Sequence, residues 1–398
     1  MNLRSLKHFC AVPPVYGLNI AAENYTSSGV RLLRTTDVGV DGRLRSETSG
    51  VFVDPAQVPP EYLLREGDLL LSRSGTLGRS LLFGEPSGPT THAGYLVRFR
   101  PAGGIVPSYL GYCAQSLLMQ DAVAADAVES TIGNFNAEKY ANVRLPWWPT
   151  TTQSVIADYL DRETARIDAM IAAKRRIVDL LVERVRLLAR DLTTRHPTMV
   201  PLRRVVRAVR TGTTPPSNLL PHLTEGPVPW FSPGDIHGWL ELGSSPRTLK
   251  SESVSNGWVP SFPGGSTLLV GIGATAGKVA YLADGPASGN QQMTCLVPND
   301  VVYPRFLTWQ LFARRNEILA TAPFTTLPII NNDFIKDLRV HLPSVQDQKK
   351  IVAHLDQEAK NAGGLTSRVG KQNLLLLERR QAIITAAVTG QLDLPEPA

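Results

Sequence analysis

The sequence predicts an α+β protein in which two similar globular halves alternate with two long helices, and the helices form an antiparallel coiled coil. Three observations support this fold class. Residues 153–188 recur without a gap at 348–383. A short apolar run, a glycine turn and a basic residue precede each copy, at 67–79 and at 265–278. Apolar residues in the repeated segments follow coiled-coil spacing. A repeat in sequence implies a repeat in structure, so we expect a pseudo-two-fold chain.

Length and composition allow a folded, nucleic-acid-binding protein. The chain has 398 residues, of which 43% are hydrophobic, and a formal net charge of +6. That length suits two to three domains, and the charge suits a polyanionic partner without requiring one. No apolar run approaches a membrane span and no export signal is evident, so we expect a cytoplasmic protein. Cys10, Cys113 and Cys295 lack the paired spacing of a zinc or redox site, and we expect no metal.

The first globular half is assigned to residues 1–150 and the second to 198–343. Both are rich in Gly, Pro and Thr and contain short β-like runs, which favours α+β halves with irregular loops. The clearest expected strands are Leu69 to Ser72, Tyr95 to Phe99, Thr267 to Val270 and Cys295 to Val297.

The first long helix is assigned to residues 151–197. Its expected seam recurs at spacings of three, four or seven, and Lys174 interrupts it. A helix of this length is about 60 Å long and needs a partner helix. The seam residues include Leu160, Ile167, Ile171, Val178, Leu181, Val185 and Leu188.

The second long helix is assigned to residues 344–392 and supplies the partner. Gly363 and Gly364 lie in its middle and predict a kink or a frayed joint there. Packing of each helix against its neighbouring domain is the alternative to a coiled coil. The expected seam residues are Leu355, Val369, Leu376 and Ile383.

The repeated helical signature is specific because its members recur in order. A Leu-Pro pair stands before each copy, at 145–146 and 342–343. The identical or similar pairs are Gln153/Gln348, Ile156/Ile351, Leu160/Leu355, Asp161/Asp356, Glu163/Glu358, Leu180/Leu375, Leu181/Leu376, Glu183/Glu378 and Arg184/Arg379.

Motifs that would indicate catalysis are missing or imperfect. The glycine loop at 271–278 encloses five residues between its outer glycines, whereas a phosphate-binding loop needs four followed by Lys and Ser or Thr. Pro13-Pro14-Val15-Tyr16 lacks the leading Asn or Asp of an amino-methyltransferase tetrad. A nuclease-like Glu358-Ala359-Lys360 lies in the helical repeat, where surface charge explains it.

The duplicated layout and the pattern Leu-Pro…Gln-x-x-Ile…Leu-Asp-x-Glu…Leu-Leu-x-Glu-Arg resemble the specificity subunit of type I restriction-modification systems of bacteria. The resemblance spans nearly the whole chain. It implies two target recognition domains, each reading one half of a split double-stranded DNA site, and two helices that set their separation. It also implies a non-catalytic chain with no cofactor of its own. Two modification subunits and the restriction subunits would be its partners and would use S-adenosylmethionine, ATP and Mg.

The candidate DNA contacts lie in the two glycine turns, because a reader of DNA needs basic groups for phosphates and polar groups for base edges. Turn structure with solvated charges is the alternative. A basic cluster at Arg203, Arg204, Arg207 and Arg210 would contact phosphate or form a solvated helix face. The candidates in the turns are Arg73, Ser74, Thr76, Arg79, Thr275 and Lys278.

Two other functional classes remain open at this point. One is a tandem coiled-coil scaffold that binds only proteins, and the other is a stand-alone DNA enzyme. Selection from a random duplex library separates them from a DNA reader. The target sequence cannot be read from the chain, because loop side chains and DNA shape set it together.

Overall fold

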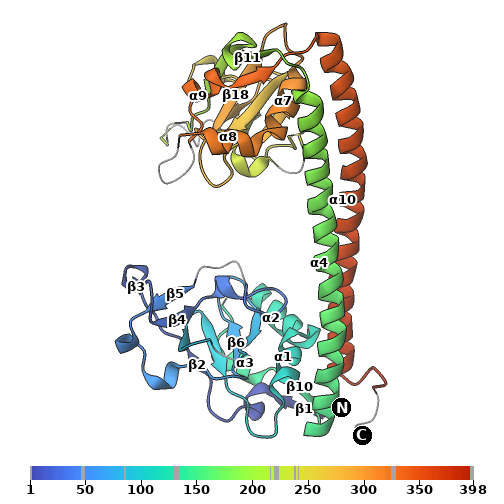
Figure 1. The fold of residues 1–398 in the computed structure, drawn as a ribbon. Coiled ribbons are helices and arrows are strands. Elements are labelled where there is room, and N and C mark those ends of the chain that lie inside the picture. The colour runs from blue at the N-terminus through green and yellow to red at the C-terminus, as the bar shows by residue number, and fades with distance from the viewer. Residues whose placement is uncertain are drawn as a thin grey trace. The chain divides into compact units, whose positions relative to one another are not determined.

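The computed structural model describes residues 2–45, 50–84, 87–129, 134–215, 217–218, 224–236, 239–240, 242–323 and 329–394. The chain divides into two compact units (Figure 1). Unit 1 consists of Met1–Ala173 and Gln372–Ala398, and unit 2 of Lys174–Lys371. Each unit therefore combines one globular half with one end of each long helix.

The described residues of unit 1 form three sheets, with strand orders β2-β9-β6-β7, β3-β5-β4-β8 and β1-β10. Its strands are β1 (Asn2–Ser5), β2 (Val15–Tyr16), β3 (Tyr25–Thr26), β4 (Val30–Leu33), β5 (Val51–Val53), β6 (Leu69–Ser72), β7 (Ser80–Leu82), β8 (Thr90–His92), β9 (Leu96–Phe99) and β10 (Arg144–Trp147). Its helices are η1 (Leu6–Phe9), η2 (Ala22–Asn24), η3 (Thr35–Asp37), η4 (Pro55–Gln57), η5 (Pro60–Tyr62), α1 (Pro107–Gln115), α2 (Leu117–Glu129) and α3 (Ala137–Asn142).

Unit 2 repeats this plan with sheets β12-β18-β15-β16, β14-β13-β17 and β11-β19. Its strands are β11 (Met199–Pro201), β12 (Val206–Thr211), β13 (Thr224–Phe231), β14 (Thr248–Leu249), β15 (Ser266–Val270), β16 (Val279–Leu282), β17 (Ser288–Gly289), β18 (Met293–Pro298) and β19 (Arg339–His341). Its helices are η6 (Leu202–Arg204), η7 (Pro233–Asp235), α6 (Glu252–Ser255), α7 (Pro304–Ala313), α8 (Arg315–Thr321) and α9 (Asn332–Asp337).

The sheets of the two units share their strand order, although the sheet β3-β5-β4-β8 of unit 1 has one strand more than the sheet β14-β13-β17 of unit 2. β9 lies between β2 and β6 in unit 1, as β18 lies between β12 and β15 in unit 2. The parallel pair β4–β8 likewise corresponds to the parallel pair β13–β17. Two halves with little sequence in common outside the helices thus share one fold, and the predicted α+β tandem repeat is confirmed.

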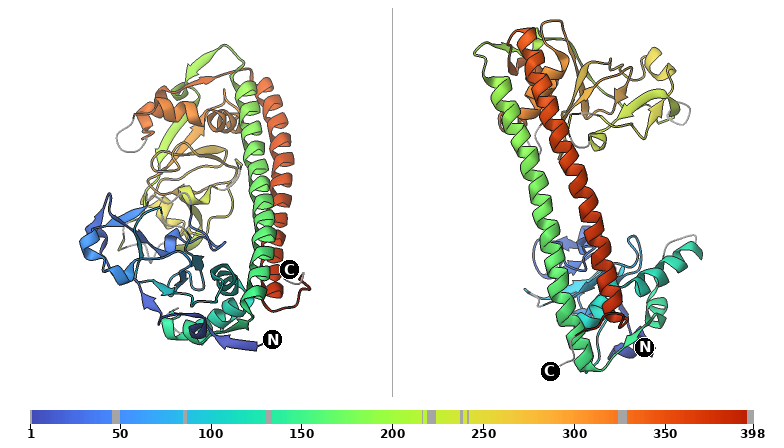
Figure 2. Two further views of the ribbon diagram at one scale, coloured as in Figure 1. Left: turned by 60° about the horizontal axis from the view of Figure 1, so that its bottom comes forward. Right: turned by 90° about the vertical axis from the view of Figure 1, so that its right-hand side faces the viewer.

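The long helices α4 (Thr150–Thr194) and α10 (Val345–Val388) run antiparallel in each unit (Figure 2). In unit 1, Leu160 near the start of α4 joins the same apolar core as Val388 at the end of α10. In unit 2, Val185 near the end of α4 joins the same core as Leu355 near the start of α10. Each globular half therefore anchors both helices through buried side chains.

Two repeated glutamines fix where each long helix leaves its globular half. Gln153 accepts from the backbone N–H of Val106, the N-cap of α1, at 2.9 Å. Gln348 accepts from the backbone N–H of Tyr303, the N-cap of α7, at 2.6 Å. Both amides are buried and also donate to a backbone carbonyl five residues before them. A buried amide must satisfy both its donor and its acceptor, so the repeat preserves a structural joint.

A second repeated residue, the aspartate at Asp161 and Asp356, ties the long helices to the sheet-covering helices. Asp161 accepts a hydrogen bond from the hydroxyl of Tyr112 in α1 at 2.6 Å. Asp356 accepts one from the indole N–H of Trp309 in α7 at 2.8 Å. The repeat keeps the carboxylate, whereas the donor differs between the units.

α10 is continuous through Gly363 and Gly364, so the frayed joint expected there is absent. The reason is tertiary: a Cβ on Gly363 would lie 3.3 Å from Nε1 of Trp239. Glycine therefore allows the helix backbone to approach the tryptophan side chain, and packing offsets its low helix propensity. Within the described residues, no helix is both long enough and apolar enough to cross a membrane.

Candidate nucleic-acid interface

The glycine turn of unit 1 connects β6 to β7, and one tyrosine side chain holds its backbone through hydrogen bonds. Gly75 and Gly78 have φ values of 77° and 76°, a left-handed conformation that favours glycine. The buried hydroxyl of Tyr140 donates to the carbonyl of Ser72 at 2.8 Å and accepts from the N–H of Gly78 at 3.1 Å. The turn is thus fixed at both ends by a side chain from α3.

The polar candidates in this turn divide into exposed and tethered side chains. Thr76 is exposed and Ser74 is half-buried. The guanidinium of Arg73 lies 4.7 Å from the centre of the Tyr16 ring. Arg79 donates to the carbonyl of Val38, just after η3, at 3.1 Å. Both arginines are half-buried, so they help to hold the turn and still reach solvent.

The glycine turn of unit 2 connects β15 to β16 at the corresponding place in the sheet. Gly273 and Gly277 have φ values of 103° and 75°. Arg315 in α8 donates twice to the carbonyl of Ala276, at 3.1 and 2.8 Å. Thr275 and Lys278 are half-buried, and the carbonyl of Thr275 accepts from the backbone N–H of Lys278. The two predicted sets of contacts therefore occupy equivalent turns.

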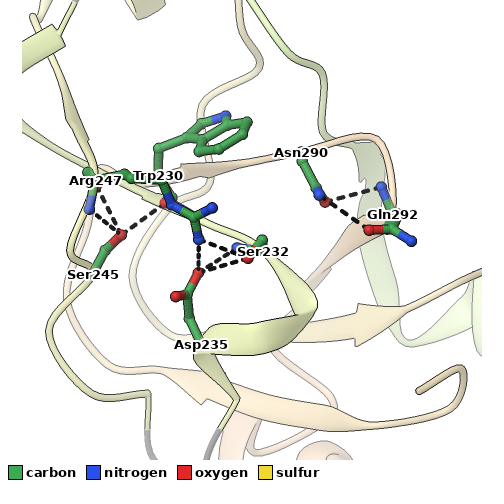
Figure 3. A network of polar contacts seen from close by, with 7 residues as sticks. All are labelled: Trp230, Ser232, Asp235, Ser245, Arg247, Asn290 and Gln292. Atoms are coloured by element: carbon green, nitrogen blue, oxygen red, sulfur yellow. Dashed lines mark hydrogen bonds and ion pairs between the residues drawn. The ribbon is translucent and has the colours of Figure 1, made fainter. Parts of the chain in front are cut away.

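A buried carboxylate near each turn was missed by the sequence reasoning. In unit 1, Asp37 at the end of η3 accepts from the backbone N–H of Arg34 at 2.8 Å and from its Nη2 at 3.4 Å. In unit 2, Asp235 at the end of η7 accepts from Ser232 and, at 2.5 Å, from Nη2 of Arg247 (Figure 3). The two aspartates are 3% and 9% exposed.

Hydrogen bonds connect the backbone near each carboxylate to the neighbouring glycine turn. In unit 1, Arg79 of the turn donates to the carbonyl of Val38, the residue after Asp37. In unit 2, Asn290 donates its backbone N–H to the last residue of β13 at 2.9 Å and its amide to Gln292 at 3.2 Å. Gln292 in turn donates to the carbonyl of Ile272 in the turn at 3.4 Å.

We call these surfaces the turn–carboxylate surfaces. That of unit 1 comprises Arg34, Asp37 and residues 73–79, and that of unit 2 comprises Ser232, Asp235, Arg247, residues 271–278 and Gln292. A local signal existed for the carboxylates, since Asp three residues after Ser232 fits a capping box. Arg247 carries no such signal, because it lies twelve residues beyond Asp235.

The basic cluster does not form one helix face. Arg203 and Arg204 belong to η6, whereas Arg207 and Arg210 belong to β12. Arg203 forms an ion pair with Asp337. Arg210 donates to a backbone carbonyl at 2.6 Å. The expectation of a single solvated helix face is therefore wrong, because alternation along a strand separates the last two side chains.

The helix positions expected to form a seam differ in burial along the chain. Leu160, Ile167, Ile171 and Leu355 are buried, whereas Val178, Leu181, Val369, Leu376 and Ile383 are half-buried. Other leucines on the same helices face solvent. Leu180 on α4 is 55% exposed and its repeat partner Leu375 on α10 is 63% exposed. Each unit thus presents an equivalent exposed leucine on a long helix.

Comparisons with known proteins agree with this architecture. Residues 198–365 match the family model of the type I restriction modification DNA specificity domain. The chain is 26% identical over 150 residues to the Escherichia coli type I restriction enzyme EcoR124I/EcoR124II specificity subunit, covering 37% of each protein. It is 30% identical over 152 residues to the Escherichia coli EcoDI specificity subunit, covering 38% of this chain and 33% of that one. The match thus spans about a third of the length of these curated relatives.

The fold is shared over the full chain with a solved structure. A chain solved in work on complex assembly and conformational transition of the type I R-M system superposes with a TM-score of 0.65 at 16% identity, covering 98% of both chains. The family match therefore covers residues 198–365, and the likeness to this solved structure shows a shared fold.

Proposed function

We propose that the chain is the DNA-recognition subunit of a type I restriction-modification complex and that each globular half reads one part of a split double-stranded site. The observation that carries this proposal is the duplicated turn–carboxylate surface. Each copy combines arginine or lysine with a threonine that is exposed in unit 1 and half-buried in unit 2, on a turn whose backbone is held by a tyrosine or arginine side chain. Phosphate contacts need the charge, and base contacts need polar groups held in place.

Catalysis is proposed to reside in partner subunits. Two modification subunits would transfer methyl groups from S-adenosylmethionine, and restriction subunits would use ATP and Mg for cleavage. The proposal for two modification subunits is supported by the repeat, because Leu180 and Leu375 expose equivalent apolar positions. Large exposed apolar side chains that recur on a surface are typical of a protein interface.

A salt titration of duplex binding tests the proposed function. Log affinity should fall linearly with log salt, because Lys and Arg displace counterions from phosphates. The variant with both Arg73→Ala and Arg79→Ala should bind more weakly and show a shallower slope, by about one unit for each phosphate that is no longer neutralised. Fluorescence anisotropy with a labelled duplex measures both quantities.

The matched control replaces Arg195, an exposed arginine paired with Asp191 on the last turns of α4. It removes the same kind of charge away from the turn. If the double variant retains the parent affinity and slope, Arg73 and Arg79 do not contact DNA. If the parent binds no duplex and instead captures protein partners, the chain is a scaffold.

Exposed leucines provide a second prediction, on assembly. Leu180→Asp should remove one modification subunit from the complex and Leu375→Asp the other, because a buried carboxylate without a partner destabilises an interface. Light scattering of the purified complex gives the stoichiometry. Val301→Asp, at an exposed position in unit 2, is the control and should leave two copies bound. Two copies bound to the Leu180/Leu375 double variant would rule out this docking surface.

A further inference from the structure

A second turn lies beside the glycine turn in each unit. In unit 1 it connects β8 to β9 over residues 93–96, and in unit 2 it connects β17 to β18 over residues 290–293. The backbone N–H of the fourth residue donates to the carbonyl of the first, at 2.9 and 3.0 Å, so both are β-turns. We call them the β8–β9 turn and the β17–β18 turn.

Backbone hydrogen bonds give the two turns equivalent positions. The N–H of Arg73, in the glycine turn of unit 1, donates to the carbonyl of Tyr95 at 2.9 Å. In unit 2 the N–H of Gly271 donates to the carbonyl of Gln292 at 2.8 Å. The first residue of each turn also donates to the last residue of β4 or β13, at 2.8 and 2.9 Å. The central residues of both turns therefore lie next to the candidate DNA contacts of the glycine turns.

The β17–β18 turn of unit 2 presents a glutamine side chain to solvent. Gln291, the second residue of the turn, is exposed, and its Oε1 accepts from the hydroxyl of Thr214 at 2.8 Å. Within the residues that the structure describes, its Nε2 has no hydrogen-bond partner. A carboxamide has two acceptor lone pairs and two N–H donors, so Gln291 can still accept one hydrogen bond and donate two. By contrast, Asn290 donates to Gln292 at 3.2 Å, so these neighbouring amides bind each other (Figure 3).

The β8–β9 turn of unit 1 has a glycine, Gly94, at the position of Gln291. Its N–H donates to the carbonyl of the residue before Asn19 at 2.9 Å, so Asn19 and Gly94 are neighbours. A Cβ on Gly94 would lie 2.0 Å from Oδ1 of Asn19, so the asparagine amide occupies that space. Asn19 is exposed, and its side chain makes no hydrogen bond to any described residue.

Asn19 and Thr214 occupy corresponding positions. Each lies two residues after a glycine whose N–H donates to the carbonyl of the first residue of β9 or β18, at 3.1 and 2.8 Å. Unit 1 thus combines Asn19 with a glycine in the turn, whereas unit 2 combines a threonine with Gln291 in the turn. Two neighbouring positions hold one available carboxamide in each unit, although the residue that supplies it differs. The units therefore share the chemical group and its place beside the glycine turn.

We propose that Asn19 and Gln291 are specificity-determining residues, each reading an adenine in the half-site of its own unit. The amide oxygen accepts from N6 of the base and the amide N–H donates to N7. This contact needs one lone pair and one N–H, and both remain available on each side chain. Adenine fits because its major-groove edge presents a donor beside an acceptor, whereas guanine presents two acceptors. The inference rests on the proposed function.

Base selection by the full-length chain tests the assignment. Parent and variants are incubated with a random duplex library, and the bound sequences give the preference at every position. Gln291→Ala should lower the preference for adenine at one position of one half-site about fivefold or more. The isosteric Gln291→Glu should favour cytosine there, because a carboxylate accepts from N4 of cytosine and cannot donate to N7 of adenine. Asn19→Ala and Asn19→Asp should have the same effects in the other half-site.

A transfer variant separates base reading from a structural role of Asn19. Asn19→Thr alone should lose the adenine preference, and Asn19→Thr with Gly94→Gln should recover it, because the pair of unit 2 is then rebuilt in unit 1. A structural role of Asn19 would give no such recovery, and failure to recover the preference would overturn the equivalence of the two positions.

The matched control is Gln357→Glu. Gln357 is an exposed amide on α10 that donates to Asn361 at 3.0 Å, away from both turns. The substitution makes the same change of shape and charge and should leave every base preference unchanged. In each turn variant, the half-site of the other unit should also keep its preferences, which shows that the chain remains folded and binds DNA.

The outcomes distinguish the inference from the function on which it rests. If the parent enriches a split motif and the Asn19 and Gln291 variants enrich the same motif, the assignment is overturned and the proposed function stands. Uniformly weaker binding with unchanged base preferences would assign both amides to the DNA backbone and also overturn it. Loss of a preference for a base other than adenine would overturn the choice of base. A parent that enriches no motif contradicts the proposed function, and the inference fails with it.

Discussion

Removing one heptad from each long helix should shorten the spacer between the preferred half-sites by about three base pairs. The deletion takes Lys174–Leu180 from α4 and Arg368–Leu374 from α10. Because the helices run antiparallel in each unit, both must lose a heptad if their apolar positions are to remain paired. Seven residues correspond to about 10 Å of helix, and a base pair rises about 3.4 Å.

The deletion also changes the rotational position that the second half-site must have about the DNA axis. Three base pairs turn the second half-site by about 100°, so the DNA must twist or the affinity must fall. The sequences of the two half-sites should survive, since the globular halves are untouched. Selection on the deletion variant, beside the parent and a variant with both heptads duplicated, measures the spacer. The duplication should lengthen the spacer by about the same amount, and one identical spacer in all three proteins would show that helix length does not set it.

Asp68→Ala should destabilise the first globular half by about 3 kcal/mol, because it leaves a largely buried guanidinium without its counter-charge. Asp68 is 1% exposed and accepts from Nε and Nη2 of Arg100, each at 2.7 Å. It also accepts from the backbone N–H of Arg65 at 2.8 Å. The hydrogen bonds to Asp68 raise the pKa of Arg100, whereas burial lowers it. The arginine stays charged when Asp68 is removed, because arginine is not deprotonated in proteins.

Chemical unfolding followed by circular dichroism measures this loss. Asp333→Ala is the control, because Asp333 is exposed and its pair with Lys336 should contribute little. In Asp68→Ala the first globular half should unfold at a lower temperature than the second. Between these two temperatures, base selection by the variant should lose one half-site and retain the other. An unfolding curve that matches the parent's would show that the Asp68–Arg100 pair does not stabilise this half.

Features that depend on local pattern were predicted well from the sequence. The predicted strand Leu69 to Ser72 has the same bounds as β6, because its apolar residues and the following glycine turn are local signals. The antiparallel helices followed from a repeat whose glutamines and aspartates make equivalent contacts in both units. Because these glutamines and aspartates recur, they could be recognised from a single sequence.

Features that depend on distant contacts were missed. The pairing of Arg247 with Asp235 requires two strands to meet, and nothing in the intervening residues signals it. Gly363 was expected to weaken α10, but it allows the helix to pack against Trp239, which is far away in the sequence. The basic cluster was expected to contact phosphate or to form a solvated helix face, but Arg203 and Arg204 lie in η6 whereas Arg207 and Arg210 lie in β12, so no single helix face forms.

The most direct test of the whole account is the motif that the unmodified chain selects from a random duplex library. Two similar halves on one pair of continuous helices predict two short blocks of strong base preference, separated by a gap of fixed length in which no base is preferred. One continuous block, a gap of variable length, or no enrichment at all would contradict it.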